Sequence, residues 1–472
     1  MQGTPSPAQA AGSLEAVEAA QPDGLPTPRR WWSVIAIWLA IAMTVLDSSI
    51  ANVALPTIAH DLGAEPADAI WVVNAYQLAV VVSLLPLSAL GELIGFRMVF
   101  RAGLALFTVA SVICAFSHSL PALTAARAVQ GLGASAVMGV NGALVRFTYP
   151  HAILGRGLGF NSMVVSASLA IGPTVASAIL AVAPWPWLFG VNLPIGAAAM
   201  AIGWAALPET PLSARRFDWL SAILNAMTFG LVVTGVDILT RTKAHITGAL
   251  ETLAGVAVGW VLVRRELRQP RPMVPVDLLR DRMFALSVLT AVVAFAGQMM
   301  ALVGLPFHFE NTLHFSQVDT GLLLTPWPVA LGLMSAVAGW LADRLSVAVL
   351  CAIGLAVFAA GLASLALLPP HPSLADIVWR MVVCGLGFGC FQSPNFRMMM
   401  TSAPRDRAGA AGAANATSRL SGQTAGAVGM AIFLQAFGGA GETFGLWTAA
   451  AIALAAAAVS LTRAAGAAKG NG

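Results

Sequence analysis

An aspartate lies inside the first long apolar stretch of the chain. The stretch begins at Trp31, and Asp47 falls within it in the segment VLDSSIANVALP. If this stretch spans a membrane, a carboxylate near the bilayer centre costs about 2.5 to 3.5 kcal/mol, so it requires a partner or a function. At 1.5 Å per residue, Arg127 lies about 9 Å inward from the outer end of a later apolar stretch, a depth in the membrane similar to that of Asp47.

An aspartate and an arginine at one depth suit proton coupling. The arginine keeps the carboxylate ionised, and the carboxylate can take up a proton when its partner moves. Protonation of Asp47 would then be linked to conformation. The alternative is a fixed ion pair that only orients two helices. Gln130, three residues after Arg127, shares its helix face and can bond to it.

The composition indicates a membrane protein. Of the 472 residues, 58% are hydrophobic and only 10% are charged, and the mean hydropathy is +0.80. Soluble domains carry about 25% charged residues. The four cysteines all lie in apolar runs, so neither a disulfide nor a metal site is expected. We interpret the excess of basic residues as membrane topology and expect no nucleic-acid partner.

Fourteen apolar runs are long enough to be transmembrane helices. They predict an all-α polytopic membrane protein. The runs are 31–54, 69–90, 98–117, 121–143, 157–181, 186–207, 218–238, 246–263, 283–307, 318–341, 346–368, 374–396, 408–436 and 443–462.

The distribution of Lys and Arg predicts the orientation. With a cytoplasmic N-terminus, most of the 25 basic residues are cytoplasmic, and only Arg241 and Lys243 lie outside. We therefore expect a bacterial-type inner (plasma) membrane protein with both termini in the cytoplasm. Residues 1–30 and 464–472 are predicted to be cytoplasmic tails, the first of them disordered and not a signal peptide.

The sequence contains an internal repeat. LGELIGFR resembles GWLADRL, and ARAVQGLGAS resembles WRMVVCGLGFG; the paired residues Glu92 and Asp343 are 251 positions apart. The repeat predicts two six-helix bundles, 31–208 and 283–463, the architecture of alternating-access transporters. Two helices in 209–264 and a cytoplasmic loop at 265–282 are inserted between them.

Short charged loops follow the repeated helices. Glu92 with Arg97, and Asp343 with Arg344, are predicted to clamp the two bundles in one state through ion pairs and helix-end interactions, and then to release them. Gly95 belongs to the same loop motif. Ordinary solvated loop charges are the alternative.

Four stretches resemble the fourteen-helix drug:proton antiporter branch of the major facilitator superfamily. LDSSIANVALPTI is similar to its first-helix signature, RAVQGLGAS to its fourth-helix motif, SLAIGPTVAS to its fifth-helix antiporter motif, and WPWLFGVNLPIG to a tryptophan-rich signature. The matching positions include Asp47, Asn52, Pro56, Arg127, Gln130, Gly131, Gly133, Gly172, Pro173, Trp185, Trp187, Phe189, Asn192, Pro194 and Gly196. Glu92 and Leu93 replace an aspartate and an arginine of the loop motif, and Ser168 replaces a glycine of the antiporter motif.

The resemblance implies the major facilitator fold and proton-coupled efflux of hydrophobic or cationic drugs or toxic compounds by a monomer. It implies no cofactor, and the partners are protons, small substrates and membrane lipids. The candidate substrate contacts are polar or aromatic residues within apolar runs, although most such residues belong to the core. They are Asn74, Tyr76, Gln77, Gln298, Gln392 and Asn395.

Other functions remain open at this point. Export of an endogenous metabolite or antibiotic would use the same cycle, and a nutrient symporter, a membrane-embedded enzyme or a receptor are further alternatives. The chain has no GxxxxGK[ST], HExxH or GxSxG motif, which argues against an enzyme. If Asp47 is not the coupling acid, Glu92, Glu310 and Asp237 are the next candidates. The sequence assigns no role to Arg380 or Arg419.

Overall fold

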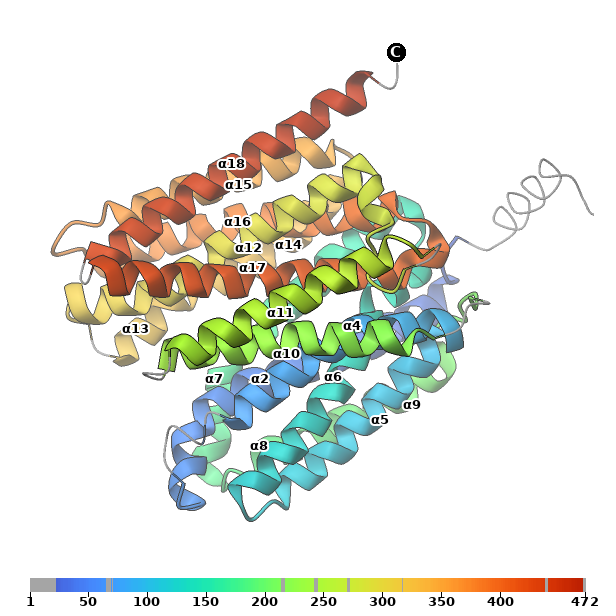
Figure 1. Ribbon diagram of the computed structural model, residues 1–472, viewed down its shortest axis with the longest axis horizontal. Coiled ribbons are helices and arrows are strands. Elements are labelled where there is room, and N and C mark those ends of the chain that lie inside the picture. Colours follow the sequence, from blue (N-terminus) through green and yellow to red (C-terminus); the bar gives the residue numbers. More distant parts are fainter. Residues whose placement is uncertain are drawn as a thin grey trace, which may run out of the picture.

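The computed structural model describes residues 23–469 apart from 65–68, 70, 214–216, 242–244, 270–271, 316 and 438–439. Its regular structure in these residues is helical throughout, with no strand. The long helices run roughly parallel to one another and form two groups, with a helical hairpin beside them (Figure 1).

The first group contains the helices before residue 207. Gly95, with a φ of 97°, makes the tight turn between two of them, a conformation that favours glycine. Ser119 caps another by accepting a hydrogen bond from the amide of Ala122 at 3.4 Å. The helices are α2 (Thr27–Asp61), α4 (Trp71–Ile94), α5 (Phe96–Ala115), α6 (Leu120–Thr148), α7 (Leu154–Val182), the short α8 (Trp187–Gly190) and α9 (Asn192–Ala206).

The second group contains the helices after residue 281. Asp281 caps the first of them, accepting from the amide of Phe284 at 2.7 Å. The helices are α12 (Arg282–Phe307), α13 (Gln317–Leu324), α14 (Pro326–Ala342), α15 (Val347–Ala366), α16 (Leu374–Ser402), α17 (Ala408–Phe437) and α18 (Gly441–Lys469). A π-helix, His308–Thr312, follows α12.

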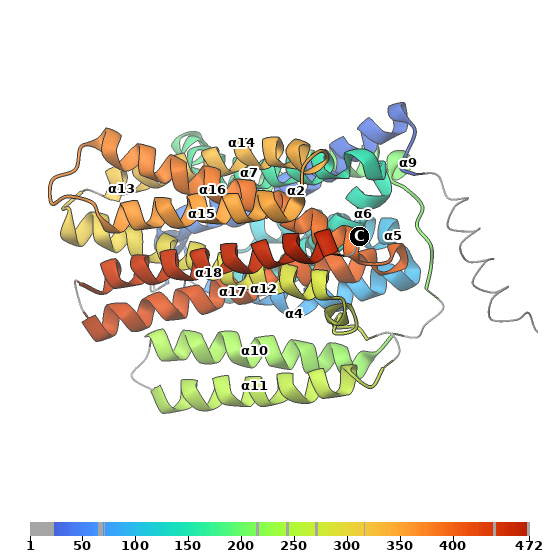
Figure 2. The same ribbon diagram turned by 90° about the horizontal axis from the view of Figure 1, so that it is seen from above.

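The remaining two helices, α10 (Trp219–Arg241) and α11 (His245–Glu266), form a hairpin along one side of the molecule (Figure 2). Helix α10 contacts α4 of the first group and α17 of the second. The hairpin therefore covers a seam between the two bundles.

Ionic contacts hold the two ends of this hairpin together at Asp218. Asp218 lies just before α10 and accepts from Arg265 at 2.9 Å, from the Ser221 hydroxyl at 2.9 Å and from Gln269. Burial disfavours the ionised carboxylate, but the hydrogen bonds from Ser221, Gln269 and Arg265 outweigh it and lower the pKa of Asp218 to about 2.

Twelve helices of the described chain are long and apolar enough to cross a membrane, or thirteen if the bent helix at 151–182 counts as one span. Each of the fourteen predicted runs overlaps a helix, but the fourteen-span count is not confirmed. The predicted run that is not among these candidate spans corresponds to α17, which is rich in Ala, Gly, Ser and Thr and contains Arg419. Because α17 packs against α4, α6, α12 and α18, it needs no apolar surface on every side.

The boundary of the predicted N-terminal tail is wrong. Residues 1–22 lie outside the described residues, but α2 begins at Thr27, four positions before the predicted run. Asp23 accepts a hydrogen bond from the amide of His151 at 3.0 Å and pairs with Arg405 at 3.1 Å. Arg29 donates to the carbonyl of Leu207 at 3.0 Å. The segment from residue 23 onward is thus fastened to both bundles.

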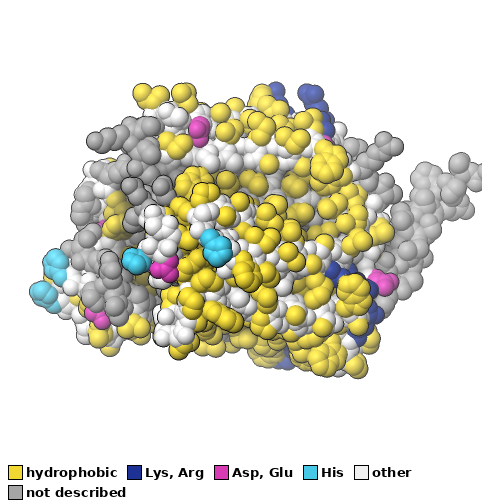
Figure 3. All heavy atoms as spheres, turned by 90° about the horizontal axis from the view of Figure 1, so that it is seen from below, with side chains coloured by type: hydrophobic (Ala, Val, Ile, Leu, Met, Phe, Trp, Pro, Cys, Tyr) yellow, Lys and Arg dark blue, Asp and Glu magenta, His cyan; other side chains and the backbone are white. Residues whose placement is uncertain are grey.

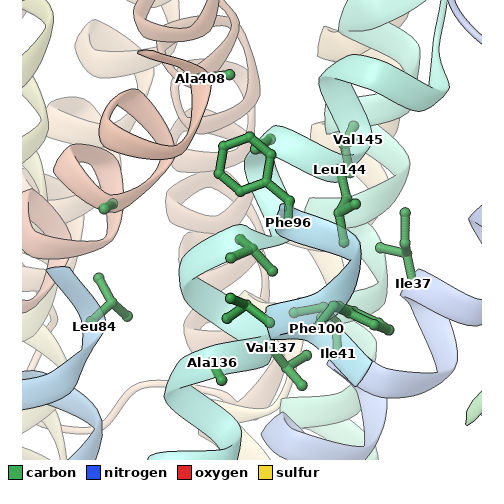
Figure 4. Close-up of a cluster of buried hydrophobic side chains, with 14 of the residues drawn as sticks. Ile37, Ile41, Leu84, Phe96, Phe100, Ala136, Val137, Leu144, Val145 and Ala408 are labelled. Atoms are coloured by element: carbon green, nitrogen blue, oxygen red, sulfur yellow. The ribbon is translucent and has the colours of Figure 1, made fainter. Parts of the chain in front are cut away.

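Hydrophobic side chains cover the lateral surface and fill the core. On the face that Figure 3 shows, the visible Lys and Arg side chains lie toward one end of the helices, and hydrophobic side chains cover much of the remaining surface. One core cluster joins the bundles, because it includes Phe96 and Leu84 of the first together with Ala408 of the second (Figure 4). This cluster supports the ends of α4, α5 and α17, where charged residues also meet.

Candidate functional site

Asp47 and Arg127 form a buried ion pair. The Arg127 guanidinium donates to Asp47 Oδ2 at 2.5 Å, and the side chains of Arg127 and Asp47 are 0% and 1% exposed. Arg127 Nε also donates to the carbonyl of Val72 at 3.2 Å, which ties α6 to α4. The structure thus brings together the two residues that the sequence placed at a similar depth.

Two amides complete the surroundings of the Asp47 carboxylate. Oδ1 accepts from Gln130 Nε2 at 3.0 Å and from Asn192 Nδ2 at 2.6 Å. Both amides also donate to the Ser111 hydroxyl, at 2.8 and 3.3 Å. Helices α2, α5, α6 and α9 therefore share one hydrogen-bonded network, and a change in the charge of Asp47 acts on all four.

Aromatic rings enclose the guanidinium of Arg127. Its Cζ atom lies 4.3 Å from the centre of the Tyr76 ring and 5.4 Å from that of Phe189. The Tyr76 hydroxyl donates to the carbonyl of Thr44 at 3.1 Å. Tyr76, predicted as a substrate contact, is thus 2% exposed and belongs to the ion-pair site. The rings exclude water and add cation–π attraction.

The predicted antiporter motif lies where α7 approaches α2. A Cβ atom on Gly172 would collide with the Ser49 side chain, so only glycine permits this approach. Ser168 is 8% exposed and donates to the carbonyl of Val164 at 2.8 Å. The helix bends by 43° between Gly172 and Thr174, at the position of Pro173.

Glu92 links the bundles through Arg407, a residue that the sequence analysis did not single out. Arg407 donates to Glu92 at 3.2 Å, and the backbone amide of Ala410, in the first turn of α17, donates to the same carboxylate at 3.0 Å. Glu92 and Arg407 are 3% and 4% exposed. Arg407 also donates to Asp277 at 2.8 Å, so the loop between α11 and α12 is held at the same place. We call this set the Glu92 clamp.

Asp343 forms the corresponding contact from the second bundle to the first. It accepts from the amides of Gly155 at 2.9 Å and Arg156 at 3.2 Å, in the first turn of α7. Its carboxylate lies 3.6 Å from the Arg156 side chain and 3.5 Å from Arg397. We call this set the Asp343 clamp. In both clamps, an acidic side chain of one bundle binds the N-terminal, positive end of a helix in the other bundle.

Of the four charged loop residues predicted to clamp the bundles, Glu92 and Asp343 contact the opposite bundle, whereas Arg97 and Arg344 make other contacts. Arg97 pairs with Glu209 at 3.1 Å, within its own bundle. Arg344 lies over the ring of Trp340, with its Cζ 4.2 Å from the ring centre. Each acid binds the first turn of a helix in the opposite bundle. The sequence therefore identified both acids but not their partners.

A small polar pocket lies between the bundles, and a larger one lies beside it. The central pocket has a volume of about 80 Å³ and is lined from α2, α6, α7, α16 and α17, with Gln392 and Arg419 among its residues. The second pocket, of about 370 Å³, is lined by α4, α10, α12 and α17. Asn74 and Gln77, two of the predicted substrate contacts, line the second pocket, as do residues of the hairpin helix α10.

The other predicted residues lie elsewhere. Asn395 donates to the carbonyl of Ser287 at 3.1 Å and accepts from Arg463 at 2.9 Å, so it is part of a buried polar cluster. Gln298 is 8% exposed on α12. The side chains of Glu310 and Asp237, the reserve coupling acids, lie outside the described residues.

The comparisons with known proteins agree with this architecture. A family model described as Major Facilitator Superfamily matches residues 37–427. The chain is 48% identical to the uncharacterized transporter YebQ of Escherichia coli strain K12 over 442 residues, covering 93% of this chain and 97% of YebQ. It is 32% identical to the multidrug resistance protein Stp of Mycobacterium tuberculosis over 400 residues, covering 84% of this chain and 74% of Stp.

Solved structures share the fold at low sequence identity. The crystal structure of the human organic anion transporter MFSD10 has a TM-score of 0.66 and 15% identity, covering 92% of this chain and 100% of that one. This likeness concerns the fold alone. With the family match across most of its length, the chain belongs to the Major Facilitator Superfamily and is a multi-pass membrane transporter, not an enzyme.

Proposed function

We propose that this transporter is a proton-coupled antiporter that exports small hydrophobic compounds, with Asp47 as the coupling acid. The observation that carries the proposal is the buried Asp47–Arg127 pair, whose members are 1% and 0% exposed. Ionisable groups inside a membrane bundle are costly and mark ion pathways. The similarity to Stp, a protein named for multidrug resistance, supports export as the direction.

Protonation of Asp47 would change what holds four helices together. The ionised carboxylate accepts from Arg127, Gln130 and Asn192. A neutral carboxyl group loses the ion pair and leaves the buried guanidinium without a counter-charge, which costs several kcal/mol. The bundle then favours a conformation in which Arg127 finds another partner or water. Proton binding is thereby converted into a shift between two conformations.

The two clamps would hold one of those conformations. Glu92 and Asp343 each join the bundles at the end of the molecule where α7 and α17 begin. We propose that this end faces the cytoplasm, that both termini lie there, and that the protein resides in a bacterial-type inner membrane. The concentration of Lys and Arg toward one end of the helices supports that orientation (Figure 3). No nucleotide is required, because the membrane potential supplies about 2.3 kcal/mol per charge per 100 mV.

The test compares two Asp–Arg pairs in proteoliposomes that contain a pH-sensitive dye. Candidate compounds are added to wild type, Asp47→Asn and the control Asp376→Asn, whose carboxylate pairs with Arg380 at 3.1 Å. We expect compound-dependent proton movement in wild type and Asp376→Asn, and at least about a tenfold loss in Asp47→Asn, a barrier change of about 1.4 kcal/mol or more. Wild-type rates in a folded Asp47→Asn protein would make the pair structural.

Export of one endogenous metabolite or antibiotic is the alternative within the same cycle. A multidrug exporter moves many unrelated hydrophobic compounds in the assay, whereas a dedicated exporter moves one. A panel of compounds with matched hydrophobicity and different shapes distinguishes them, and a response to a single compound would replace multidrug export by dedicated export.

A further inference from the structure

The central pocket contains a positive charge with no counter-charge among its lining residues. Its polar lining comes from both bundles, so a molecule held there would contact both halves of the transporter. Within the described residues, the lining has no carboxylate. The polar lining residues are Asn141, Asn161, Ser162, Gln392, Asn415 and Arg419.

Arg419 differs from other arginines within the membrane helices. Three of them donate to side chains of the protein: Arg127 to Asp47, Arg380 to Asp376, and Arg463 to Ser287 and Asn395. In the part of the chain that the structure describes, Arg419 has no hydrogen bond and no ion pair, and its Nε atom is buried without a partner. An arginine is always charged in proteins, so this site carries a full positive charge.

Two further polar atoms of the same pocket are also unpartnered. They are Oδ1 of Asn141 and Oδ1 of Asn161, on residues that are 7% and 5% exposed. Of the fifteen buried side-chain atoms without a partner in the described residues, these two and Nε of Arg419 line one cavity. Each costs free energy comparable to a lost hydrogen bond. Three of them around one cavity indicate a place that a polar molecule fills.

We propose that the central pocket binds an organic anion, with a carboxylate of the substrate on Arg419 and hydrogen-bond donors of the substrate on Asn141 and Asn161. This inference rests on the proposed export function, because it names the class of compound exported. A planar carboxylate matches the fork of a guanidinium group. The sequence analysis favoured hydrophobic or cationic compounds, but a cation would be repelled by Arg419.

The size of the pocket fits the anionic end of a larger molecule. A volume of about 80 Å³ corresponds to about two or three water molecules at roughly 30 Å³ each, which is enough for a carboxylate. Leu420, the next residue on α17, lines the second pocket of about 370 Å³. Once the bundles move, the second pocket can accommodate an apolar group that is attached to the carboxylate.

The test uses two matched pairs of probes that differ in charge. Fluorescein and rhodamine 123 share a ring system but are anionic and cationic, and benzoate and benzamide are anionic and neutral. Binding is measured as the change in thermal unfolding of the detergent-purified protein, and transport is measured in proteoliposomes with a pH gradient. The variants are Arg419→Gln, Arg419→Lys and the control Arg380→Gln.

We expect wild type to bind at least one anion of the two pairs more tightly than its partner. Arg419→Gln should weaken that binding about tenfold to a hundredfold, the effect of a charged hydrogen bond, and Arg419→Lys should recover part of it. Arg380→Gln should leave the affinity unchanged. Without probe, Arg419→Gln should unfold at the same or a higher temperature than wild type, because it removes an uncompensated charge, whereas loss of the paired Arg380 should lower it.

The outcomes separate this inference from the proposed function. Preference for the cation or the neutral probe, binding that is indifferent to Arg419, or no binding of either anion would overturn the anion site. Movement of rhodamine 123 by the pH gradient would then leave the export proposal standing. Anion binding that requires Arg419 but is never driven by the pH gradient would support the site and refute proton-coupled export.

Discussion

At the scale of single residues, the Asp47–Arg127 pair was the most predictable feature. The cost of a charge in an apolar run identified both residues, and the helical rise gave them similar depths. The sequence could not show that Asn192 and Ser111 join them, because these residues lie on α9 and α5 and meet only when the bundle forms. Asn192 was present in the segment WPWLFGVNLPIG, but side-chain convergence is a property of packing.

The amide of Asn192 provides a prediction at this scale. Asn192→Leu removes one donor to Asp47 Oδ1 and leaves the ion pair with Arg127 in place. Because this hydrogen bond joins α9 to the buried Asp47 carboxylate, its loss should lower the rate of proton-driven transport in proteoliposomes by about tenfold, the effect of losing a hydrogen bond to a charged group.

The matched control for this prediction is Asn225→Leu. It also removes a buried asparagine amide, but that amide donates to the carbonyl of Val82 at 2.9 Å and is absent from the Asp47 network. Its transport rate should match that of wild type. An unchanged rate in a folded Asn192→Leu protein would contradict the prediction.

At the scale of secondary-structure elements, helices were easier to predict than their contacts. Apolar runs located every long helix, including the hairpin α10–α11, because each run is long enough to span a membrane. The sequence did not identify Arg407 and Arg156 as partners of Glu92 and Asp343, because contacts between the two bundles join residues far apart in the sequence. Helix α17 also shows that an interior helix can lack the composition of a membrane span.

The Glu92 clamp provides a prediction about the start of α17. Glu92→Gln removes the charge that binds Arg407 and weakens the hydrogen bond from the amide of Ala410. We expect faster hydrogen exchange at that amide and in the first turn of α17, measured by mass spectrometry. Glu209→Gln, which breaks an exposed pair with Arg97, is the matched control and should change nothing there. Equal exchange in wild type and Glu92→Gln would refute the clamp.

The hairpin provides a prediction about pH. The pKa of Asp218 is lowered to about 2 in the folded protein, from an ordinary value of 3.8. Its contribution to stability is therefore complete above about pH 4 and is lost as the pH falls toward 2. Asp218→Asn should be less stable than wild type at neutral pH, and the difference should shrink on acidification. Thermal unfolding in detergent at several pH values tests this, and a difference independent of pH would contradict it.

At the scale of the whole molecule, the internal repeat predicted two bundles, and the helices form two groups (Figure 1), but the repeat did not indicate how they are joined. The two clamps act in parallel at one end of the molecule, and each connects an acid of one bundle to the first turn of a helix in the other. Opening that end requires both to break. The free energies that the two clamps contribute to the closed state of that end should therefore add.

This arrangement predicts the effect of removing both clamps. Spin labels at Met98 and Leu345, exposed residues of the two bundles, report the separation of that end by double electron–electron resonance. We expect Glu92→Gln and Asp343→Asn each to raise the population of long distances, and the double variant to raise it further. If the double variant matches wild type, the clamps do not control the separation.

The reciprocal exchange of acids and helix ends also has an evolutionary consequence. A substitution at Glu92 changes what the second bundle must supply at Arg407, and a substitution at Asp343 changes what the first bundle must supply at Arg156. The two bundles therefore cannot diverge independently at these positions. The residues tolerated at each position depend on the partner residue in the opposite bundle. Compensating substitutions are therefore expected to appear in that opposite bundle.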